Sequence, residues 1–300
     1  MVFGVVGDVI LDITVQAHGP LQLGSDVVGK ISYQGGGSAA NLATWLGSLG
    51  SEVRFAGALG QDLAGQISRL ELERYRVETF LAEKTEPTGT ILLFLDEEGE
   101  RTMVTSRGAN LLLRTPDLPP EFFQGLSHLH LTAYSLFGSE ELARTALEIL
   151  DQARQMGFPI SVDPSSYALL EEFGVERFLT ATKGVSLLFP NLEEGRMLSG
   201  EGTPEAIVKV LLRHYPVVVL TLGLEGCLCG QGEELFYVPT PQVPVVDTTG
   251  AGDAFAAGFL HEFYQSSSLI AAAHAGNALA SSCVQHYGGR PPWKAGTLDR

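Results

Sequence analysis

The sequence predicts an α/β fold in which helices cover both faces of a mainly parallel central sheet. Short apolar runs of strand length alternate along the chain with amphipathic, helix-like stretches, and this alternation is typical of parallel sheets covered on both sides. Two stretches, 27–34 and 88–107, break the alternation and indicate a small accessory sheet. We therefore expect one domain over residues 1–300, built as a three-layer sandwich, with a β lid formed by segments near 12–34 and 87–108.

The first strand and the first helix are predicted from the spacing of apolar residues. Residues 2–6 are an apolar run that ends at Gly7, which indicates a buried strand opening onto a polar site. After the glycines at 35–37, apolar residues recur with helical spacing until Gly50. We therefore expect a helix over 38–49.

The alternation continues through the rest of the chain. A helix is expected from Ser139 to Gly157, and the apolar segment 158–162 that follows it ends at Asp163. Ligands in such folds usually lie beyond the carboxyl ends of the strands, so we expect the site at that edge of the sheet. Further buried strands are expected at 185–189, 217–222 and 243–246, with helix-like stretches at 192–215, 252–264 and 268–286.

Composition and charge argue against several classes of protein. The 300 residues are 45% hydrophobic and 18% charged, which is ordinary for a soluble globular protein, and no apolar run approaches the roughly 20 residues of a membrane helix. Residues 1–15 lack the basic start and cleavage site of a secretion signal, so we expect the cytoplasm. The net charge of −16, from 19 basic and 35 acidic side chains, opposes binding to nucleic acid. A single nucleotide is compatible with this charge, because N–H groups at a helix start hold phosphates without a basic surface.

The sharpest functional signal is the segment 247–253, Asp-Thr-Thr-Gly-Ala-Gly-Asp, which stands between a strand-like run and a helical stretch. Glycines permit a tight turn and the close approach of an anion, and the helix start adds unpaired N–H groups and partial positive charge. Asp253 would be repelled by that anion unless it had a task, such as accepting a proton from an attacking hydroxyl. The alternative is that Asp247 and Asp253 only cap the turn and the helix, but seven residues all suited to one turn favour function.

The second signal is the segment 35–41, in which three glycines lead into a helix whose first turn exposes Asn41. It contains Gly-x-Gly-x-x-Ala, which is a dinucleotide fingerprint, but that motif should end the first strand of a βαβ unit, and here an earlier strand ends at Gly7. A loop that binds hydroxyls through glycine backbone and a carboxamide fits the segment better. The alternative is a plain glycine turn with a capping asparagine.

Together these segments resemble the two signature regions of the PfkB, or ribokinase-like, carbohydrate kinase family, and the resemblance spans essentially the whole chain. It implies a sheet sandwiched between helices, with a lid, and the ATP-dependent phosphorylation of an alcohol group on a sugar or sugar-containing small molecule. In chain order, the matching residues are Gly7 with Asp12, the segment 35–41, Gly60-x-Asp62 with Gly65, Asn191-x-x-Glu194, Thr221-x-Gly223-x-x-Gly226 and the segment 247–253.

The resemblance assigns the catalytic and acceptor-binding roles by position. It implies that Asp253 is the catalytic base, which agrees with the reasoning from charge above. The main-chain anion hole that it implies is formed by the N–H groups of Gly250, Ala251 and Gly252. The residues that it implies for binding substrate hydroxyls are Asp12, Gly36 and Asn41.

The remaining roles implied by the resemblance concern ATP and metal ions. Asn191 and Glu194 would hold Mg²⁺ through water, since Mg²⁺ prefers oxygen ligands and keeps part of its hydration shell. Family kinases often bind a monovalent cation beside the anion hole, which makes K⁺ a candidate near Asp247 and Thr249. The residues implied to border the nucleotide are Thr221, Gly223 and Asn277.

Three places in the sequence bear on the substrate. Arg107, on the predicted lid, could pair with an anionic substrate group or could be a solvated arginine of a hairpin. The segment 163–167 lacks the nearby arginine that resembles a carboxylate or fructose contact in some sugar-acid kinases and fructokinases, which argues against those substrates. Tyr134 stands near the position where ribokinases have an acid. Ribose-like sugars, nucleosides and phosphosugars all stay open.

Other functions compete with a carbohydrate kinase. A nucleoside kinase of the same fold differs only in its acceptor, whereas a non-catalytic sugar or nucleotide sensor would keep the fold and lose turnover. Intact Asp253 and Asn191-x-x-Glu194 argue against a sensor, because a sensor needs no base. A dehydrogenase would require NAD binding, for which the fingerprint is misplaced. Exposed strands of the lid would also allow two copies of the chain to pair as a homodimer.

Overall fold

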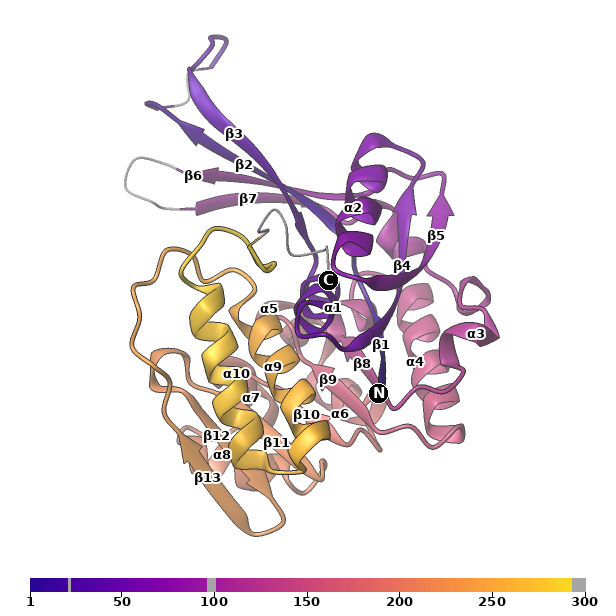
Figure 1. The fold of residues 1–300 in the computed structure, drawn as a ribbon, viewed down its shortest axis with the longest axis vertical. Helices are drawn as coiled ribbons and strands as arrows, with labels where there is room; N and C mark the ends of the chain where they lie inside the picture. The colour runs from indigo at the N-terminus through magenta and orange to yellow at the C-terminus, as the bar shows by residue number, and fades with distance from the viewer. Residues whose placement is uncertain (21–22, 96–100, 293–300) are drawn as a thin grey trace.

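The computed structural model describes residues 1–20, 23–95 and 101–292, in which a large sheet lies between two layers of helices and a smaller sheet projects from one end of it (Figure 1). The strands are β1 (Val2–Val6), β2 (Ile10–Ala17), β3 (Gly29–Gly36), β4 (Glu52–Gly60), β5 (Val77–Lys84), β6 (Gly89–Leu95), β7 (Arg101–Ser106), β8 (His128–Thr132), β9 (Ile160–Asp163), β10 (Leu187–Leu188), β11 (Val217–Thr221), β12 (Cys227–Gln231) and β13 (Glu234–Val238).

The α-helices are α1 (Ser38–Ser48), α2 (Leu63–Arg74), α3 (Pro120–Phe123), α4 (Glu140–Gln155), α5 (Tyr167–Phe173), α6 (Val175–Ala181), α7 (Leu192–Ser199), α8 (Pro204–Leu211), α9 (Ala251–Ser266) and α10 (Leu269–Cys283). Short 3₁₀ turns are η1 (Gly108–Leu112), η2 (Thr115–Asp117), η3 (Ala133–Leu136) and η4 (Gly223–Glu225).

The order of the strands places a crevice at the centre of the large sheet. Within the described residues this sheet has nine strands in the order β13-β12-β11-β10-β9-β8-β1-β4-β5. Every neighbouring pair from β11 to β5 is parallel, and the hairpin β12–β13 adds an antiparallel edge. After β1, the chain adds β4 and β5 on one side of that strand, and it then adds β8 to β13 in order on the other side. Such a switch in direction opens a crevice at the carboxyl ends of the strands. The predicted sheet, mainly parallel and covered on both faces, is confirmed.

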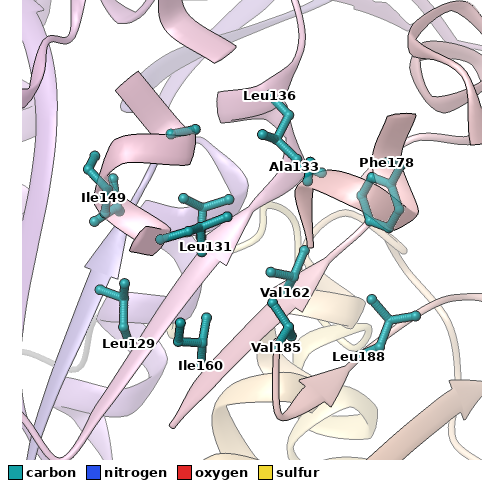
Figure 2. Packing of buried hydrophobic residues seen from close by; sticks show 14 of the residues in the cluster. Leu129, Leu131, Ala133, Leu136, Ile149, Ile160, Val162, Phe178, Val185 and Leu188 are labelled. Atoms are coloured by element: carbon teal, nitrogen blue, oxygen red, sulfur yellow. The ribbon is translucent and has the colours of Figure 1, made fainter. Parts of the chain in front are cut away.

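Alternate residues of the buried strands pack on opposite faces of the sheet. In β11, Val218 belongs to the hydrophobic cluster under α3 to α8, and Val219 belongs to the cluster under α1, α9 and α10. Because both faces are covered, these strands read as unbroken apolar runs, and that is why they were predictable. Figure 2 shows part of the first cluster, in which Leu131 of β8 and Val162 of β9 project into the layer that holds Ile149 of α4.

The smaller sheet consists of the stretches that break the sequence pattern. Its order is β3-β2-β6-β7, and β2 lies opposite β3 with Asp12 facing Gln34. The base of β6 is tied to α2, because Asp62 accepts hydrogen bonds from both the N–H and the hydroxyl of Thr88. A separate small sheet of this kind was predicted and is confirmed. Its strands extend past the expected bounds, beginning at Ile10 and reaching Gly36. Residues 96–100 of the stretch 88–107 lie outside the described residues.

Most of the predicted helices are present, with one division. The helix expected at 38–49 is α1, and Ser139 caps α4 by accepting a hydrogen bond from the N–H of Leu142. The stretch 192–215 is not one helix but two, α7 and α8, because Gly200 adopts a left-handed conformation with φ 72° and ends the first of them. Helix α7 itself starts at the expected position, Leu192, where Asn191 caps it.

The strand predicted at 243–246 is wrong. Residues 239–246 are irregular, and the strand at this edge is instead β13 of the hairpin β12–β13. Pro241 and Pro244 lack the N–H groups that a strand in a ladder must donate, so the apolar valines around them do not join the sheet. Val243 and Val245 line a cavity instead, as described below.

Candidate active site

The segment 247–253 forms a turn that ends in the first turn of α9. The Asp247 carboxylate accepts hydrogen bonds from the N–H groups of Thr249, at 2.8 Å, and Gly288, at 3.0 Å. Gly250 is the N-cap residue in a left-handed conformation, with φ 73°, and a Cβ added there would collide with the backbone of Gly289. The first turn of α9 therefore begins at a closely packed glycine, and its N–H groups have no carbonyl partner within the helix.

Asp253 lies in that first turn, and its carboxylate contacts two residues from the N-terminal part of the sequence. The hydroxyl of Ser38 donates to Asp253 Oδ1 at 2.6 Å, and the amide of Asn41 donates to Oδ2 at 2.8 Å. Burial raises the pKa of Asp253 to about 6, and these two hydrogen bonds oppose the rise. The carboxylate is thus held in one orientation and is mostly ionised at neutral pH.

The residues expected to bind substrate hydroxyls also lie at this junction. Oδ1 of Asp12 and Oδ1 of Asn41 are buried and accept no hydrogen bond. A Cβ added at Gly36 would collide with the Asp12 carboxylate, so only glycine allows β3 to pass so close to it. Buried acceptors without donors are costly, and a substrate hydroxyl would satisfy each of these two.

A polar cavity of about 230 Å³ opens beside Asp253. It is bounded by the segment 250–253, by Ser38 at the start of α1 and by Tyr134 in η3. Two further carboxylates reach it, Asp163 at the end of β9 and Glu194 in α7. The remaining lining residues are Ser165, Phe189, Asn191, Thr221, Thr248 and Phe255.

The carboxylates of this cavity repel one another. Burial raises the pKa of Asp163 well above its usual value, and the charges of Glu194 and Asp253 raise it further. Burial also raises the pKa of Glu194 to about 7, against hydrogen bonds from Asn191 that lower it. A cluster of this kind favours protons or cations over a second anion, and it accepts phosphate only where main-chain donors and metal ions offset the charge.

Asn191 and Glu194 form a capping box at the start of α7. The N–H of Asn191 donates to Glu194 Oε2, and the N–H of Glu194 donates to Asn191 Oδ1, both at 2.9 Å. Asn191 also bridges to Thr221 at the end of β11. One oxygen of each side chain is therefore already bonded to backbone, although both residues line the polar cavity.

A second cavity, also of about 230 Å³, lies on the other side of the start of α9. Thr221, Thr248, Ala251, Gly252 and Phe255 line both cavities, so the helix start separates two adjoining compartments. The walls of the second compartment are largely apolar and include the residues of the irregular segment. These walls comprise Gly223, Leu224, Gly226, Thr240, Pro241, Val243, Val245, Asn277, Ala280, Ser281 and Val284.

Asn277 holds one wall of the second cavity in place. Its amide donates to the carbonyl of Val238 at 2.9 Å and to that of Pro239 at 3.3 Å. Thr221, the last residue of β11, and Gly223, the first residue of η4, also line this cavity. The structure therefore brings the three residues assigned to the nucleotide around one compartment, next to the anion-binding turn.

Arg107 is the predicted site residue with the most contacts to protein. Its Nε and Nη2 pair with the Asp8 carboxylate at 2.8 and 2.9 Å. Nη1 and Nη2 also donate to the carbonyls of Phe137, at 2.7 Å, and Tyr134, at 2.8 Å. Its side chain is only 15% exposed, so it is not a solvated arginine of the lid. The contacts link the end of β1 to η3, which carries Tyr134.

Sequence reasoning missed three residues of the site. Ser38 stands three positions before Asn41 on one helical face, and that spacing was available as a signal. Asp163 was seen to end a strand, and its place at the same sheet edge could have assigned it to the site. Arg290, which donates to the carbonyl of Gly36 at 2.9 Å, lies 254 positions away and carries no local signal.

Two searches of the described ranges concern metals and membranes. No group of three or more His, Cys, Asp or Glu side chains there is arranged to hold a metal ion. None of the helices in the described part of the chain is both long and apolar enough to cross a membrane. The cytoplasmic location stays a prediction.

A glycine-rich helix start beside a buried carboxylate, at the junction of two cavities, is compatible with a small-molecule phosphotransferase. The family model of the pfkB family carbohydrate kinases matches residues 4–295. The chain therefore belongs to this family of kinases, whose members use ATP, generally with Mg²⁺. The family resemblance of the sequence is thereby confirmed.

Individual relatives span the same length of chain. A 2-dehydro-3-deoxygluconokinase of Bacillus subtilis is 29% identical over 83% of this chain and 80% of its own length. A ribokinase of Mus musculus is 28% identical over 95% of this chain and 89% of its own. The crystal structure of an adenosine kinase from Sinorhizobium meliloti superposes with a TM-score of 0.86 at 24% identity, covering 97% of this chain and 95% of that one. These relatives and the solved structure are similar to the chain in fold, and their acceptors differ from one another.

Proposed function

We propose that this chain transfers the γ-phosphoryl group of ATP to an alcohol group of a neutral sugar or sugar-containing small molecule, with Asp253 as the general base. The observation that carries the proposal is the place of Asp253. It lies in the first turn of α9 and accepts hydrogen bonds from Ser38 and Asn41 of the segment 35–41, which we call the acceptor loop. One side chain would thus adjoin both the proposed phosphate site and the proposed acceptor site.

The reaction uses position and charge more than covalent chemistry. Phosphoryl transfer passes through a loose transition state, so a kinase mainly aligns donor with acceptor and offsets charge on the phosphate oxygens. The N–H groups of Gly250, Ala251 and Gly252 would offset that charge, and Asp253 would accept the proton as the hydroxyl attacks. A base with a pKa of about 6 is ionised at neutral pH and can still be protonated by the reaction.

The charges around the acceptor favour a neutral substrate. Asp12, Asp163 and Asp253 are carboxylates with raised pKa values, so the pocket already opposes negative charge. Arg107 does not offer a substrate anion a positive charge that could balance these carboxylates, because its nitrogens already bond to Asp8 and to two carbonyls. We therefore propose that Arg107 shapes the pocket by fixing η3, and that sugar acids and phosphosugars are poor acceptors.

The donor is proposed to occupy the second cavity, with its phosphates toward the start of α9. The apolar walls suit a nucleobase, and Thr221, Gly223 and Asn277 surround it. Asn191 and Glu194 offer oxygen ligands, which Mg²⁺ prefers, and their capping bonds favour contact through water, as expected. Mg²⁺ bound there would neutralise charge on the phosphates. We also propose that K⁺ binds near Asp247 and Thr249. The buried carboxylate of Asp247, beside the proposed anion-binding turn, supports this.

The small sheet is proposed to act as a lid over one domain that comprises the rest of the chain. Asp12 and Gly36 lie at its base, so movement of β2 and β3 would carry acceptor-binding groups with it. Closure over the acceptor would exclude water, which otherwise competes as an acceptor of the phosphoryl group.

The proposal is tested by measuring ADP release against a panel of acceptors. The panel contains pentoses, hexoses, nucleosides, sugar acids and phosphosugars, with ATP and Mg²⁺ and with or without K⁺. We expect turnover with at least one neutral sugar or nucleoside, and kcat/KM at least about tenfold lower for its phosphorylated analogue, since like charges in a buried site cost more than 1.4 kcal/mol. Absence of turnover with every acceptor, together with tight binding of a sugar, would favour a sensor.

A nucleoside kinase is the second candidate, and one observation favours it. The Tyr134 ring lines the polar cavity and burial raises the pKa of its hydroxyl to about 12, so it presents a neutral aromatic wall. A nucleobase can stack on such a wall, whereas a free sugar gains less from it. Adenosine and inosine therefore belong in the panel beside ribose and fructose.

We further propose that two chains pair through the outer face of the lid. Ile31, Tyr33 and Val104 are 57%, 61% and 57% exposed. The strand register places Tyr33, Ile13, Leu92 and Val104 in one row, on the face opposite Asp12. We expect light scattering to give twice the mass of one chain, and Tyr33→Lys with Val104→Lys to give one chain. Leu70→Lys on α2, at a residue 62% exposed, is the control. A monomeric parent protein would contradict the proposal.

A further inference from the structure

Arg290 contacts the acceptor loop at Gly35 and Gly36. Its side chain is 6% exposed, and Nη1 pairs with Glu71 Oε2 of α2 at 2.7 Å. Nη2 donates to the carbonyl of Gly36 at 2.9 Å. The guanidinium packs against Gly35, where an added Cβ would collide both with it and with the Glu71 carboxylate. Helix α2 lies beside the bases of β2 and β3, so this pair connects the helix to the lid strands (Figure 1).

Asp12 packs against Gly36, the neighbour of Gly35. An added Cβ at Gly36 would collide with the Asp12 carboxylate, as one at Gly35 would with Arg290. Asp12 Oδ1 is buried without a hydrogen-bond donor. Both oxygens of such a carboxyl act only as acceptors while it is ionised, whereas protonation turns one of them into a donor.

The charges that act on Asp12 oppose one another. Burial raises its pKa to about 6; the charge of Arg290 lowers that pKa, and the charges of Asp247, Glu71 and Asp253 raise it. Without the guanidinium, the carboxyl would keep its proton nearer to neutral pH. It would then offer a donor where the substrate hydroxyl needs an acceptor.

The backbone around Arg290 is held independently of its side chain. Trp45 Nε1 donates to the carbonyl of Gly289 at 2.8 Å, and the Tyr75 hydroxyl donates to that of Pro291 at 2.6 Å. The N–H of Gly288 donates to Asp247 at 3.0 Å. Replacement of the Arg290 side chain therefore leaves the bonds that fix the turn in place.

We propose that Arg290 is a positioning residue of the acceptor subsite, which fixes the Gly36 carbonyl and supplies the positive charge that keeps Asp12 an acceptor for substrate hydroxyls. The proposal deepens the proposed function and rests on it only in taking Asp12 as the acceptor contact. Glu71 has two effects: its carboxylate anchors the Arg290 guanidinium, and its negative charge raises the pKa of Asp12. Loss of Arg290 and loss of Glu71 should therefore act on Asp12 in opposite directions.

The first test needs no substrate. The protein is labelled with ¹³C at aspartate carboxyls, the Asp12 resonance is identified by its loss in Asp12→Asn, and its titration is followed by NMR. We expect the midpoint to rise in Arg290→Met and to fall in Glu71→Gln. Arg196→Met, which breaks an exposed pair with Glu193 on α7, should leave it unchanged. Unchanged midpoints in both variants, or shifts in the same direction, would overturn the proposal even if no acceptor were known.

The second test is kinetic and uses D-ribose, D-fructose or whichever acceptor of the panel is turned over. At pH 7 we expect Arg290→Met to raise KM for the acceptor by about tenfold or more, as losing a charged partner does, with KM for ATP within about twofold of the parent. The defect should shrink at pH 9, where Asp12 is ionised again, and Arg290→Lys should restore part of it. A general structural defect would instead raise both constants at every pH, and that result would count against Arg290 as a positioning residue.

Discussion

Replacement of Asp253 by asparagine should lower kcat by about 10² to 10⁴, the range that loss of a general base typically costs. Asparagine keeps an oxygen that can accept the Ser38 hydroxyl, so the contact to the acceptor loop is largely preserved. It cannot accept a proton from the attacking hydroxyl. The measurement is kcat with the best acceptor of the panel, alongside the melting temperature as a check on the fold.

The control and the pH profile sharpen this test. Glu193→Gln, which removes an exposed carboxylate of α7, should leave kcat unchanged. In the parent, activity should fall as the pH drops through about 6, because burial raises the pKa of Asp253 to about 6 and the protonated acid is no base. If Asp253→Asn kept more than about a tenth of kcat, well above the range expected for a lost base, the role of Asp253 would be refuted.

Replacement of Gly250 by alanine should have the second large effect. The new Cβ would collide with the backbone of Gly289, so the turn that starts α9 must move. Displacing one donor of an anion hole typically costs about 10² to 10³ in rate, and we expect a loss of that size in kcat. The measurement is kcat under saturating ATP, so that weaker donor binding does not account for the loss.

Gly157→Ala is the matched control for Gly250→Ala. Gly157 has nearly the same φ, 76° against 73°, and a Cβ added there meets nothing within 4 Å. Both variants carry the strain of alanine in a left-handed conformation, about 1–2 kcal/mol, but only Gly250→Ala disturbs the anion site. Equal activity in the two variants would mean that the turn at 250 does not contribute donors to the reaction.

The parts of the fold that sequence predicts are those with local signals. Helix α1 follows from the spacing of its apolar residues, and the strands β1 and β11 follow from unbroken apolar runs. The valines at 243–246 misled the same reasoning, because Val243 and Val245 line a cavity and Val245 and Val246 are 46% and 44% exposed. A short apolar run is therefore not by itself evidence of a buried strand.

The residues of the candidate site also fall into two groups, those with a local sequence signal and those without one. The segment 247–253 carries its own signature, since a strand, a glycine turn and a helix start are consecutive in sequence. By contrast, Asp253 meets Ser38 across 215 positions, and Arg290 meets Gly36 across 254. Contacts of such separation are determined by the strand order around β1, which no local pattern encodes.

The hydrogen bonds from Ser38 and Asn41 to Asp253 bear on how the enzyme is made in a cell. Ser38 and Asn41 leave the ribosome well before Asp253, whose carboxylate accepts their hydrogen bonds. A chain interrupted during translation before residue 250 would carry Ser38 and Asn41 but not their partner Asp253. Under the proposed mechanism such a product lacks the general base, so it would not phosphorylate an acceptor.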